Sequence, residues 1–412
     1  MADESGTVEG VRQRNLGRIL RLVHHDGPQS RAALTDATGL NRSTVADLVG
    51  LLVEADLVIE RAPDPSRRVG RPSPIVAVSP VPVAIAVNPE VDALEIAAVG
   101  LDQQIVARVR HPLDDLLTPE RTADLVADQL AAWRAGALAQ SRIVGLGLAV
   151  PGLVRAADGV VRDAPHLQWR DAPLGEQVAL TTGLPTTVGN DASLGALAEH
   201  LYGAARGIDD VVYLNGGASG IGGGLIVGGV PVGGAGGYAG EFGQNRPGIA
   251  DAAARRARDG VLEDEVSRSR LLAVARLTRA DDDELAAALA TASPDIADEV
   301  ARQRGILATA LANAVNVLNP AVIVLGGFLA ALATLDVPGL EDDVRAQSMP
   351  ACAESVRIVP AALAGDRLLI GAAEAVFVGL LENVPVQSAA WEPSTTAGRR
   401  PRSTSKTARS RT

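Results

Sequence analysis

Residues 30–45 read SRAALTDATGLNRSTV, and this stretch decides the fold of the N-terminal part of the chain. Ser30 is a residue type that caps helix starts and Gly39 is one that ends helices, so a short helix is predicted between them. Asn41 can cap the helix that follows, whose buried stripe begins at Val45. Two helices joined by a tight glycine-containing turn are typical of a helix-turn-helix.

A longer helix is predicted in front of this pair. Its apolar residues have the i, i+3, i+4, i+7 spacing of an amphipathic helix: Leu16, Ile19, Leu20 and Val23. His24 and His25 follow this stripe directly and are predicted to mark a solvent-exposed helix end.

A hairpin is predicted after the third helix, with strands at residues 57–60 and 75–78. The loop between these strands is rich in arginine and holds a single acid, Asp64, beside Arg61, Arg67, Arg68 and Arg71. A basic loop of this kind next to a helix-turn-helix predicts a winged helix, which we place in residues 1–80.

The expected ligand of this winged helix is double-stranded DNA. Arg42, Ser43 and Thr44 occupy the first turn of the third helix, where side chains reach base edges and free backbone N–H groups favour phosphate. Arg67 and Arg68 would contact the phosphate backbone, and Arg71 is predicted to enter a minor groove. The alternative is a small helical bundle that serves dimerisation.

Composition narrows the class of protein. The chain of 412 residues has a net charge of −11, 2% aromatic residues and one cysteine, Cys352. These values exclude an internal disulfide and a multi-cysteine zinc site, and they disfavour a base-stacking platform for single strands. No apolar run is long enough for a membrane span, and no secretory signal is visible, so a cytoplasmic location is expected.

Charge is distributed unevenly along the chain. Residues 81–398 carry 22 basic and 39 acidic side chains, whereas residues 1–80 are balanced and the last fourteen residues hold six basic side chains and no acid. An acidic body repels a polyanion, so contact with DNA is expected from an end of the chain. Residues 383–412 are predicted to be a disordered basic tail, which either adds nonspecific attraction to DNA or has no selected role.

Residues 81–382 are predicted to form two α/β lobes with a cleft between them. Strands at 84–87, 93–99 and 104–109 precede a helix at 123–135 and a strand at 143–149, and a similar order recurs at 211–214, 221–227 and 321–325. We place the lobe boundary near residue 188 and expect the last helix, 366–381, to return to the first lobe. A glycine-rich run at 216–237 can turn backbone N–H groups toward a phosphate or sugar oxygen.

Short motifs along most of the chain are similar to those of the ROK family (repressors, open reading frames and sugar kinases). The motifs that carry the resemblance are SRAAL at 30–34, GLNRSTV at 39–45, GRP at 70–72, AVPG at 149–152, APHLQW at 164–169, GNDA at 189–192, AGEFG at 239–243, NP at 319–320 and VLGG at 324–327. The resemblance implies an actin-like ATPase fold. The winged helix in front resembles the repressor branch, whose members bind operators and respond to sugars.

The resemblance also implies a sugar site. Asn190 and Asp191 match the family's sugar-binding pair, in which the aspartate is the general base of the kinases, although capping of the next helix by Asn190 is a simpler role. Glu241 and Glu263 match further sugar contacts, and His166 stands where asparagine is common. The ligand is therefore expected to be a small sugar or a sugar derivative.

Two departures from the family pattern argue against catalysis. The kinases' phosphate loop, Asp-x-Gly-x-Thr, is replaced at residues 86–92, where Pro89 removes an N–H donor and Glu90 adds negative charge. The family's zinc ligands, a histidine and three cysteines, correspond to Gln244, Ala254, Arg256 and Val261, none of which replaces a thiolate or imidazole. We therefore predict no catalytic residue, no metal and no cofactor, with Asp191 as a vestigial general base.

Together these patterns predict a sugar-responsive transcriptional repressor that binds a palindromic operator as a homodimer or a dimer of dimers. Two alternatives stay open: a sugar kinase with an added DNA-binding domain, and a ligand-independent architectural or dimerisation protein. Whether the ligand releases or strengthens DNA binding is left open.

Overall fold

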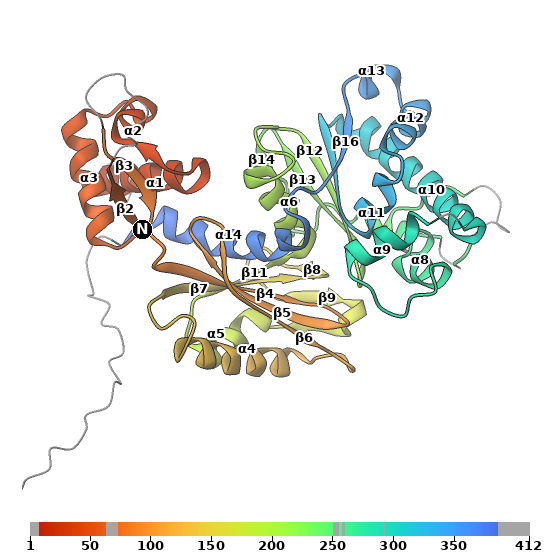
Figure 1. Ribbon diagram of the computed structural model, residues 1–412, viewed down its shortest axis with the longest axis horizontal. Coiled ribbons are helices and arrows are strands. Elements are labelled where there is room, and N and C mark those ends of the chain that lie inside the picture. The colour runs from red at the N-terminus through yellow and green to blue at the C-terminus, as the bar shows by residue number, and fades with distance from the viewer. Residues whose placement is uncertain (1–7, 63–72, 250–254, 258–259, 292, 386–412) are drawn as a thin grey trace, which may run out of the picture.

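The computed structural model describes residues 8–62, 73–249, 255–257, 260–291 and 293–385 of the chain. A small head, formed by the described residues up to 78, precedes two α/β lobes that we call the body (Figure 1). None of the helices in these ranges has the length and apolarity needed to cross a membrane.

The head is a winged helix in its described part. Its helices and strands are α1 (Val8–Asp26), β1 (Gln29–Ser30), α2 (Arg31–Thr38), α3 (Arg42–Glu54), β2 (Val58–Arg61) and β3 (Ile75–Val78). The Ser30 hydroxyl accepts a hydrogen bond from the Ala33 N–H at 3.1 Å, and the Asn41 side chain accepts one from the Thr44 N–H at 2.8 Å. Both predicted caps are thereby confirmed, as is the hairpin, in which β2 and β3 pair antiparallel.

The loop that joins β2 to β3 falls largely outside the described residues. Arg67, Arg68 and Arg71 all lie in the stretch 63–72, so their predicted contacts with DNA stay predictions. The predicted tail lies outside the described residues from position 386 onward.

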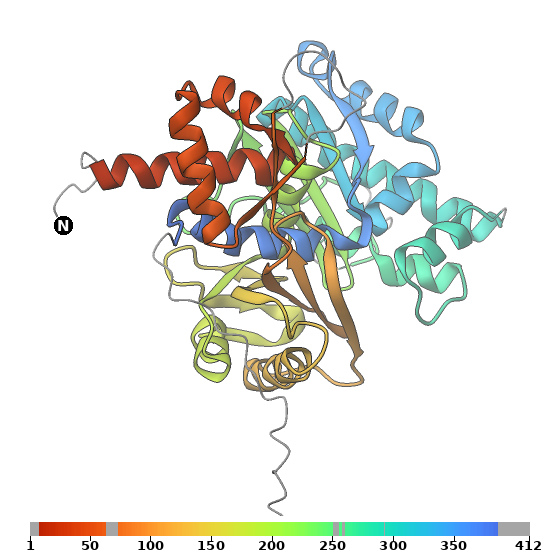
Figure 2. The same cartoon turned by 60° about the vertical axis from the view of Figure 1, so that its left-hand side comes forward.

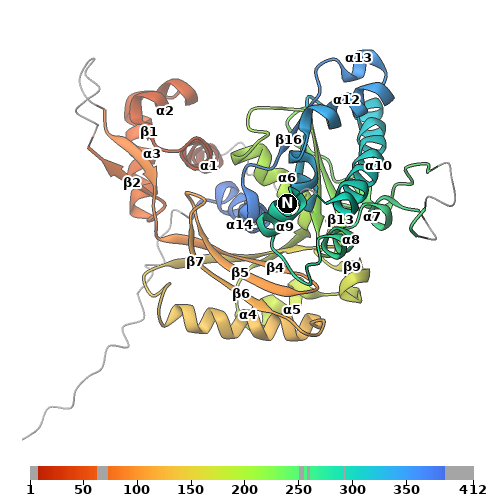
Figure 3. The same ribbon diagram turned by 45° about the vertical axis from the view of Figure 1, so that its right-hand side comes forward.

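The first lobe is built on a five-stranded sheet in the order β11-β7-β4-β5-β6. Its strands are β4 (Pro82–Pro89), β5 (Ala93–Gly100), β6 (Ile105–Pro112), β7 (Arg142–Val150) and β11 (Thr186–Asn190). The helices α4 (Pro119–Arg134) and α5 (Leu174–Thr182) lie on one face of the sheet, and the last helix, α14 (Arg367–Glu382), lies on the other (Figure 3). A small sheet of β8 (Leu153–Val154), β9 (Val161–Ala164) and β10 (Trp169–Ala172) extends this lobe.

Alternation along β4 explains why both faces of the first sheet are covered. Val83, Ile85 and Val87 point into the core under α4, whereas Ala84 and Ala86 point toward α14. Small residues let the helix approach closely: a Cβ added at Gly147 of β7 would lie 2.0 Å from the Ala372 carbonyl oxygen of α14. A nonpolar, small-residue face therefore fixes where the last helix packs.

The second lobe repeats this plan. Its sheet runs β14-β13-β12-β15-β16, so that an antiparallel three-stranded unit is again followed by parallel strands. The strands are β12 (Val211–Gly217), β13 (Gly220–Val227), β14 (Val230–Pro231), β15 (Val322–Gly327) and β16 (Arg357–Pro360). The helices are α6 (Asp191–Tyr202), which connects the lobes, α7 (Leu262–Glu265), α8 (Arg268–Val274), α9 (Asp282–Leu289), α10 (Pro294–Leu318), α11 (Phe328–Thr334), α12 (Val337–Gln347) and α13 (Pro350–Ala353). The mixed α/β fold predicted from the sequence is thus confirmed.

The head rests on the body through α1, which packs against α14 (Figure 2). The apolar stripe of α1 and the end of α14 belong to one core cluster that includes Leu16, Leu20, Phe377 and Leu381. A Cβ added at Gly17 would lie 2.2 Å from the Leu381 carbonyl oxygen, so the absence of a side chain at this position permits the close crossing.

Candidate functional site

A cavity of about 300 Å³ lies between the two lobes. Five of its lining residues are the ones predicted to bind a ligand: His166, Asn190, Asp191, Glu241 and Glu263. They come from both lobes and from sequence positions almost one hundred residues apart, so the fold brings together what the motifs indicated separately.

Asn190 and Asp191 sit where β11 ends and α6 begins. The Asn190 side chain accepts a hydrogen bond from the Ser193 N–H at 2.9 Å, which caps α6, and donates one to the Gly152 carbonyl at 3.0 Å. Capping and a place in the cavity wall therefore coexist. Asp191 is 5% exposed, and burial raises the pKa of its carboxyl group.

Glu263 is the best-satisfied carboxylate of the cavity. It accepts hydrogen bonds from the Ile221 N–H at 3.2 Å and from the Gln244 amide at 2.6 Å, and the His166 ring nitrogen lies 4.0 Å away. Burial alone would raise the pKa of Glu263, but His166 and these donors hold it below the ordinary value. In return, Glu263 raises the pKa of His166.

The carboxyl groups of Glu90 and Glu241 have fewer hydrogen-bond donors and positive charges around them than Glu263 has. Burial, with Asp191 nearby, raises the pKa of each to about 7. Glu90 accepts a hydrogen bond from the Ser219 hydroxyl. Sequence reasoning placed Glu90 only in the former phosphate loop and missed its place in this cavity, as it missed Ser219 and Gln244. The sequence signal that could have indicated this place is the charged residue Glu90 in a loop where the family has small residues.

The backbone around Glu90 offers little to a phosphate. Pro89 has no N–H, and the Glu90 N–H is already bonded to the Ala93 carbonyl at 2.8 Å. The Asn88 amide is buried and donates to the Ala149 carbonyl at 2.8 Å. A larger hollow of about 760 Å³ adjoins the cavity, and Gly327 of the VLGG motif lies in its wall.

The segment that holds zinc in the family is held here by a buried carboxylate. Glu265 accepts hydrogen bonds from the backbone N–H groups of Arg256 and Ala257, at 2.9 and 3.0 Å, and pairs with the Arg302 guanidinium. The residue types at Gln244, Arg256 and Val261 do not fit a zinc ion. The ion pair of Glu265 with Arg302 and these hydrogen bonds therefore stabilise the described part of this segment.

The first turn of α3 faces outward from the head. Arg42 and Ser43 are exposed and Thr44 is half-buried, while Val45 and Leu48 anchor the helix in the core. Other head arginines are engaged locally: Arg18 donates to the Thr38 carbonyl at 2.8 Å, and Arg31 pairs with Glu60. Among the described residues, none forms a hydrogen bond or ion pair with the Arg42 side chain, which leaves it available for an external partner.

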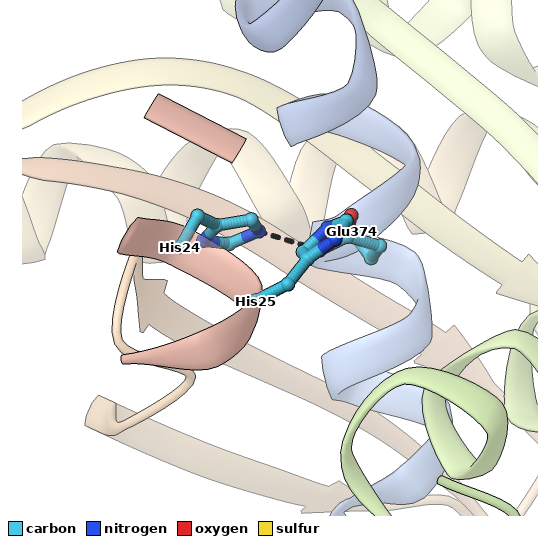
Figure 4. Close-up of side chains that lie close together, drawn as sticks. All are labelled: His24, His25 and Glu374. Atoms are coloured by element: carbon cyan, nitrogen blue, oxygen red, sulfur yellow. Dashed lines mark hydrogen bonds and ion pairs between the residues drawn. The ribbon is translucent and has the colours of Figure 1, made fainter. Parts of the chain in front are cut away.

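The prediction that His24 marks a solvent-exposed helix end is wrong. His24 is 2% exposed, because the C-terminal end of α1 packs against the body instead of facing water. Its Nδ1 lies 2.6 Å from the Leu101 carbonyl oxygen and its Nε2 lies 2.8 Å from a carboxylate oxygen of Glu374 on α14 (Figure 4). His25 is half-buried beside it and lies 3.2 Å from the other Glu374 oxygen. We call His24, His25 and Glu374 the joint cluster.

Helix α6 connects the cavity with this joint. It begins at Asp191 in the cavity wall and ends at Tyr202, whose hydroxyl donates to Glu374 at 2.7 Å and lies 3.0 Å from His24 Nε2. Just beyond it, Arg206 donates to the His25 carbonyl at 3.2 Å. Helix α6 therefore runs from the cavity wall to the residues that hold the head.

Fold and site together define a class: a winged-helix head on a body of two sugar-kinase-like lobes. Residues 84–377 match the ROK family, and the chain belongs to it. A xylose repressor of Caldicellulosiruptor bescii is 24% identical over 389 residues, which cover 90% of this chain and 97% of the relative. A glucokinase of Streptomyces coelicolor is 32% identical, but over only 40% of this chain and 50% of its own length.

A solved structure has the same overall fold. The crystal structure of a ROK family transcriptional regulator, a homologue of the Escherichia coli MLC protein, has a TM-score of 0.72 and 24% sequence identity, and the match covers 90% of this chain and 98% of that one. The likeness thus includes the head, whereas the match to the kinase is partial.

Proposed function

We propose that this protein is a sugar-responsive transcriptional repressor. Its head would bind operator DNA through Arg42, Ser43 and Thr44 of α3 and through Arg67, Arg68 and Arg71 of the wing. The observation that carries the proposal is the continuous connection from the interlobe cavity, along α6, to the residues that hold the head. Repressors that match over nearly the whole chain support it.

The cavity suits a small polyhydroxylated ligand. Its volume of about 300 Å³ is at the lower end for small-molecule pockets. Carboxylates such as Asp191, Glu241 and Glu263 accept hydrogen bonds from hydroxyl groups, while Asn190 and His166 can donate. A monosaccharide or a close derivative has the size and the hydroxyl density to use both kinds of group.

Closure of the lobes around the ligand would move α6, because Asp191 at its start belongs to the cavity and Tyr202 at its end touches the joint cluster. In a symmetric oligomer, a homodimer or a dimer of dimers, tilting both heads changes the spacing of the two recognition helices relative to the operator half-sites. A ligand shifts this equilibrium only by its difference in affinity for the two states, which is typically about 1–3 kcal/mol.

Phosphotransfer is not part of the proposal. An ATP-dependent kinase needs backbone N–H groups for the phosphates, and the loop at Pro89 and Glu90 offers few, with a carboxylate at the place where the triphosphate would approach. We interpret the neighbouring hollow of about 760 Å³, with Gly327 in its wall, as a retained part of the family scaffold.

Calorimetry with a panel of monosaccharides, with and without ATP and Mg²⁺, tests the site. We expect at least one sugar to bind the full chain, Asp191→Asn to weaken that binding, and the exposed control Asp102→Asn to leave it unchanged. ATP should cause no sugar phosphorylation above background. Measurable phosphotransfer that Asp191→Asn abolishes would favour the kinase, and no binding by any sugar would favour an architectural protein.

A further inference from the structure

The joint cluster gathers metal-binding side chains at the opposite end of α6 from the cavity. Two imidazoles at the end of α1 face the two oxygens of one carboxylate on α14, and these donor atoms all lie within 4.8 Å of one another (Figure 4). The His24 and His25 ring centroids are 5.0 Å apart. Residues 350 positions apart in the chain thus converge on one point.

The hydrogen bonds of His24 leave its second nitrogen facing this point. Nδ1 lies 2.6 Å from the Leu101 carbonyl oxygen, which can only accept, so Nδ1 carries the ring proton. In the neutral tautomer, Nε2 then directs a lone pair at the Glu374 carboxylate, 2.8 Å away. Two lone pairs at this separation repel each other, so either a proton on Nε2 or a metal ion has to lie between the two atoms.

We propose that His24, His25 and Glu374 form a binding site for a divalent transition-metal ion, with Zn²⁺ as the best match. Two neutral imidazole nitrogens and one carboxylate are a ligand set that zinc uses, and a water molecule would complete four-coordination. The bond from His24 Nδ1 to a backbone carbonyl is the kind of outer contact that orients metal-binding histidines.

Burial and access fit an ion that enters from one side. The His24 and Glu374 side chains are 0% and 2% exposed, whereas the His25 side chain is 22% exposed and lies at the opening. With neutral imidazoles, the carboxylate of Glu374 gives the buried joint cluster a negative charge, which a divalent ion would compensate. A shift of a few tenths of an ångström among the donors gives room for the ion.

The site would act on the head and not on the cavity. Because its ligands come from α1 and α14, a bound ion would fasten the head to the body at the contacts that the end of α6 also reaches, and it would add a second input to the proposed regulator. This inference does not depend on the identity of the sugar or of the operator, and it stands or falls separately from the proposed function.

The test uses the untagged full chain after removal of metal with a chelator. We expect calorimetry to show one Zn²⁺ per chain, with affinity reduced about 100-fold or more in His25→Gln and in Glu374→Gln, since even outer contacts of metal sites change affinity by about 10–100-fold. The matched control is His111→Gln, which removes a half-buried histidine of β6 outside the joint cluster and the cavity and should bind Zn²⁺ like the parent. Co²⁺ should give the visible absorption of a four- or five-coordinate ion with nitrogen and oxygen ligands.

Thermal unfolding of the parent and the variants gives a second readout, which also shows whether each variant is folded. Zn²⁺ should raise the melting temperature of the parent and of His111→Gln, because an ion that binds only the folded state stabilises it. His25 is partly exposed, so His25→Gln should fold and lose this shift. The proposal is overturned if the parent binds no stoichiometric Zn²⁺, or if both joint variants bind it as the parent does.

Discussion

At the scale of single residues, Glu90 separates this chain from the kinases of its family. Its carboxyl group is buried next to Asp191, which raises its pKa from the ordinary 4.5 to about 7. Between these two values the folded protein keeps a proton that the unfolded chain has released. The contribution of protonated Glu90 to the free energy of unfolding is therefore complete below about pH 4.5. It is lost as the pH rises through about 7 and the buried carboxyl group ionises.

Glu90→Gln should consequently stabilise the protein at pH 8 and change little at pH 4.5. The amide keeps the shape of the side chain without the buried charge, and the gain is at most about 3 kcal/mol for a shift of this size. Melting temperatures at the two pH values measure it. Glu176→Gln on the exposed side of α5 is the control, and an equal effect of Glu90→Gln at both pH values would contradict the assignment.

Arg42 is the residue whose role in DNA binding is easiest to isolate. Arg42→Ala should weaken binding to a selected operator fragment by about 1–3 kcal/mol and barely change binding to unrelated DNA, because a lost base contact affects sequence preference. Fluorescence anisotropy with both kinds of fragment measures the difference. Arg134→Ala on α4 removes the same charge far from the head, and similar losses in the two variants would count against a base contact by Arg42.

At the scale of elements, close crossings decide how α14 and α1 pack. Gly17→Ala should destabilise the protein by about 1–3 kcal/mol, because its Cβ would lie 2.2 Å from the Leu381 carbonyl oxygen. Gly50→Ala in α3 has no atom within 4 Å of the new Cβ and should instead stabilise by about 0.5–1 kcal/mol. Urea unfolding measures both changes, and a Gly17→Ala variant at least as stable as the parent would contradict the close crossing of α1 and α14.

Helix α6 is the element that links sugar binding to the head. Tyr202→Phe keeps the ring but removes the hydroxyl that contacts Glu374 and His24. We expect sugar affinity to stay within about two- to threefold of the parent value, while the effect of the sugar on DNA affinity largely disappears. Calorimetry and anisotropy on the same variant measure both quantities, with Tyr238→Phe as the control. An undiminished effect of sugar would show that another route carries the coupling.

At the scale of the whole molecule, local patterns predicted the elements well. The helix caps at Ser30 and Asn41, the hairpin after α3 and the strands of both sheets follow from residue types and short-range periodicity. The five predicted cavity residues could be identified because each belongs to a motif of the family, and the fold brings them together in one cavity.

What the sequence did not indicate are contacts between distant segments. The burial of His24 depends on Leu101 and Glu374, which are 77 and 350 positions away, and nothing near His24 in the chain signals them. The same holds for Glu90, whose place in the cavity depends on the pairing of β4 with β5 and on Ser219 from the second lobe. Long-range packing sets these environments, and local propensity carries no information about it.

The central claim is that a sugar in the interlobe cavity changes how the head binds DNA. Its most direct test is the affinity of the full chain for genomic fragments selected by that chain, measured by anisotropy with and without each sugar of the panel. We expect at least one sugar to change the DNA affinity of the parent by about fivefold or more, in line with ordinary coupling energies. The same sugar should leave the DNA affinity of Asp191→Asn unchanged. Affinity that no sugar alters, in a protein that still binds its fragments, would contradict it.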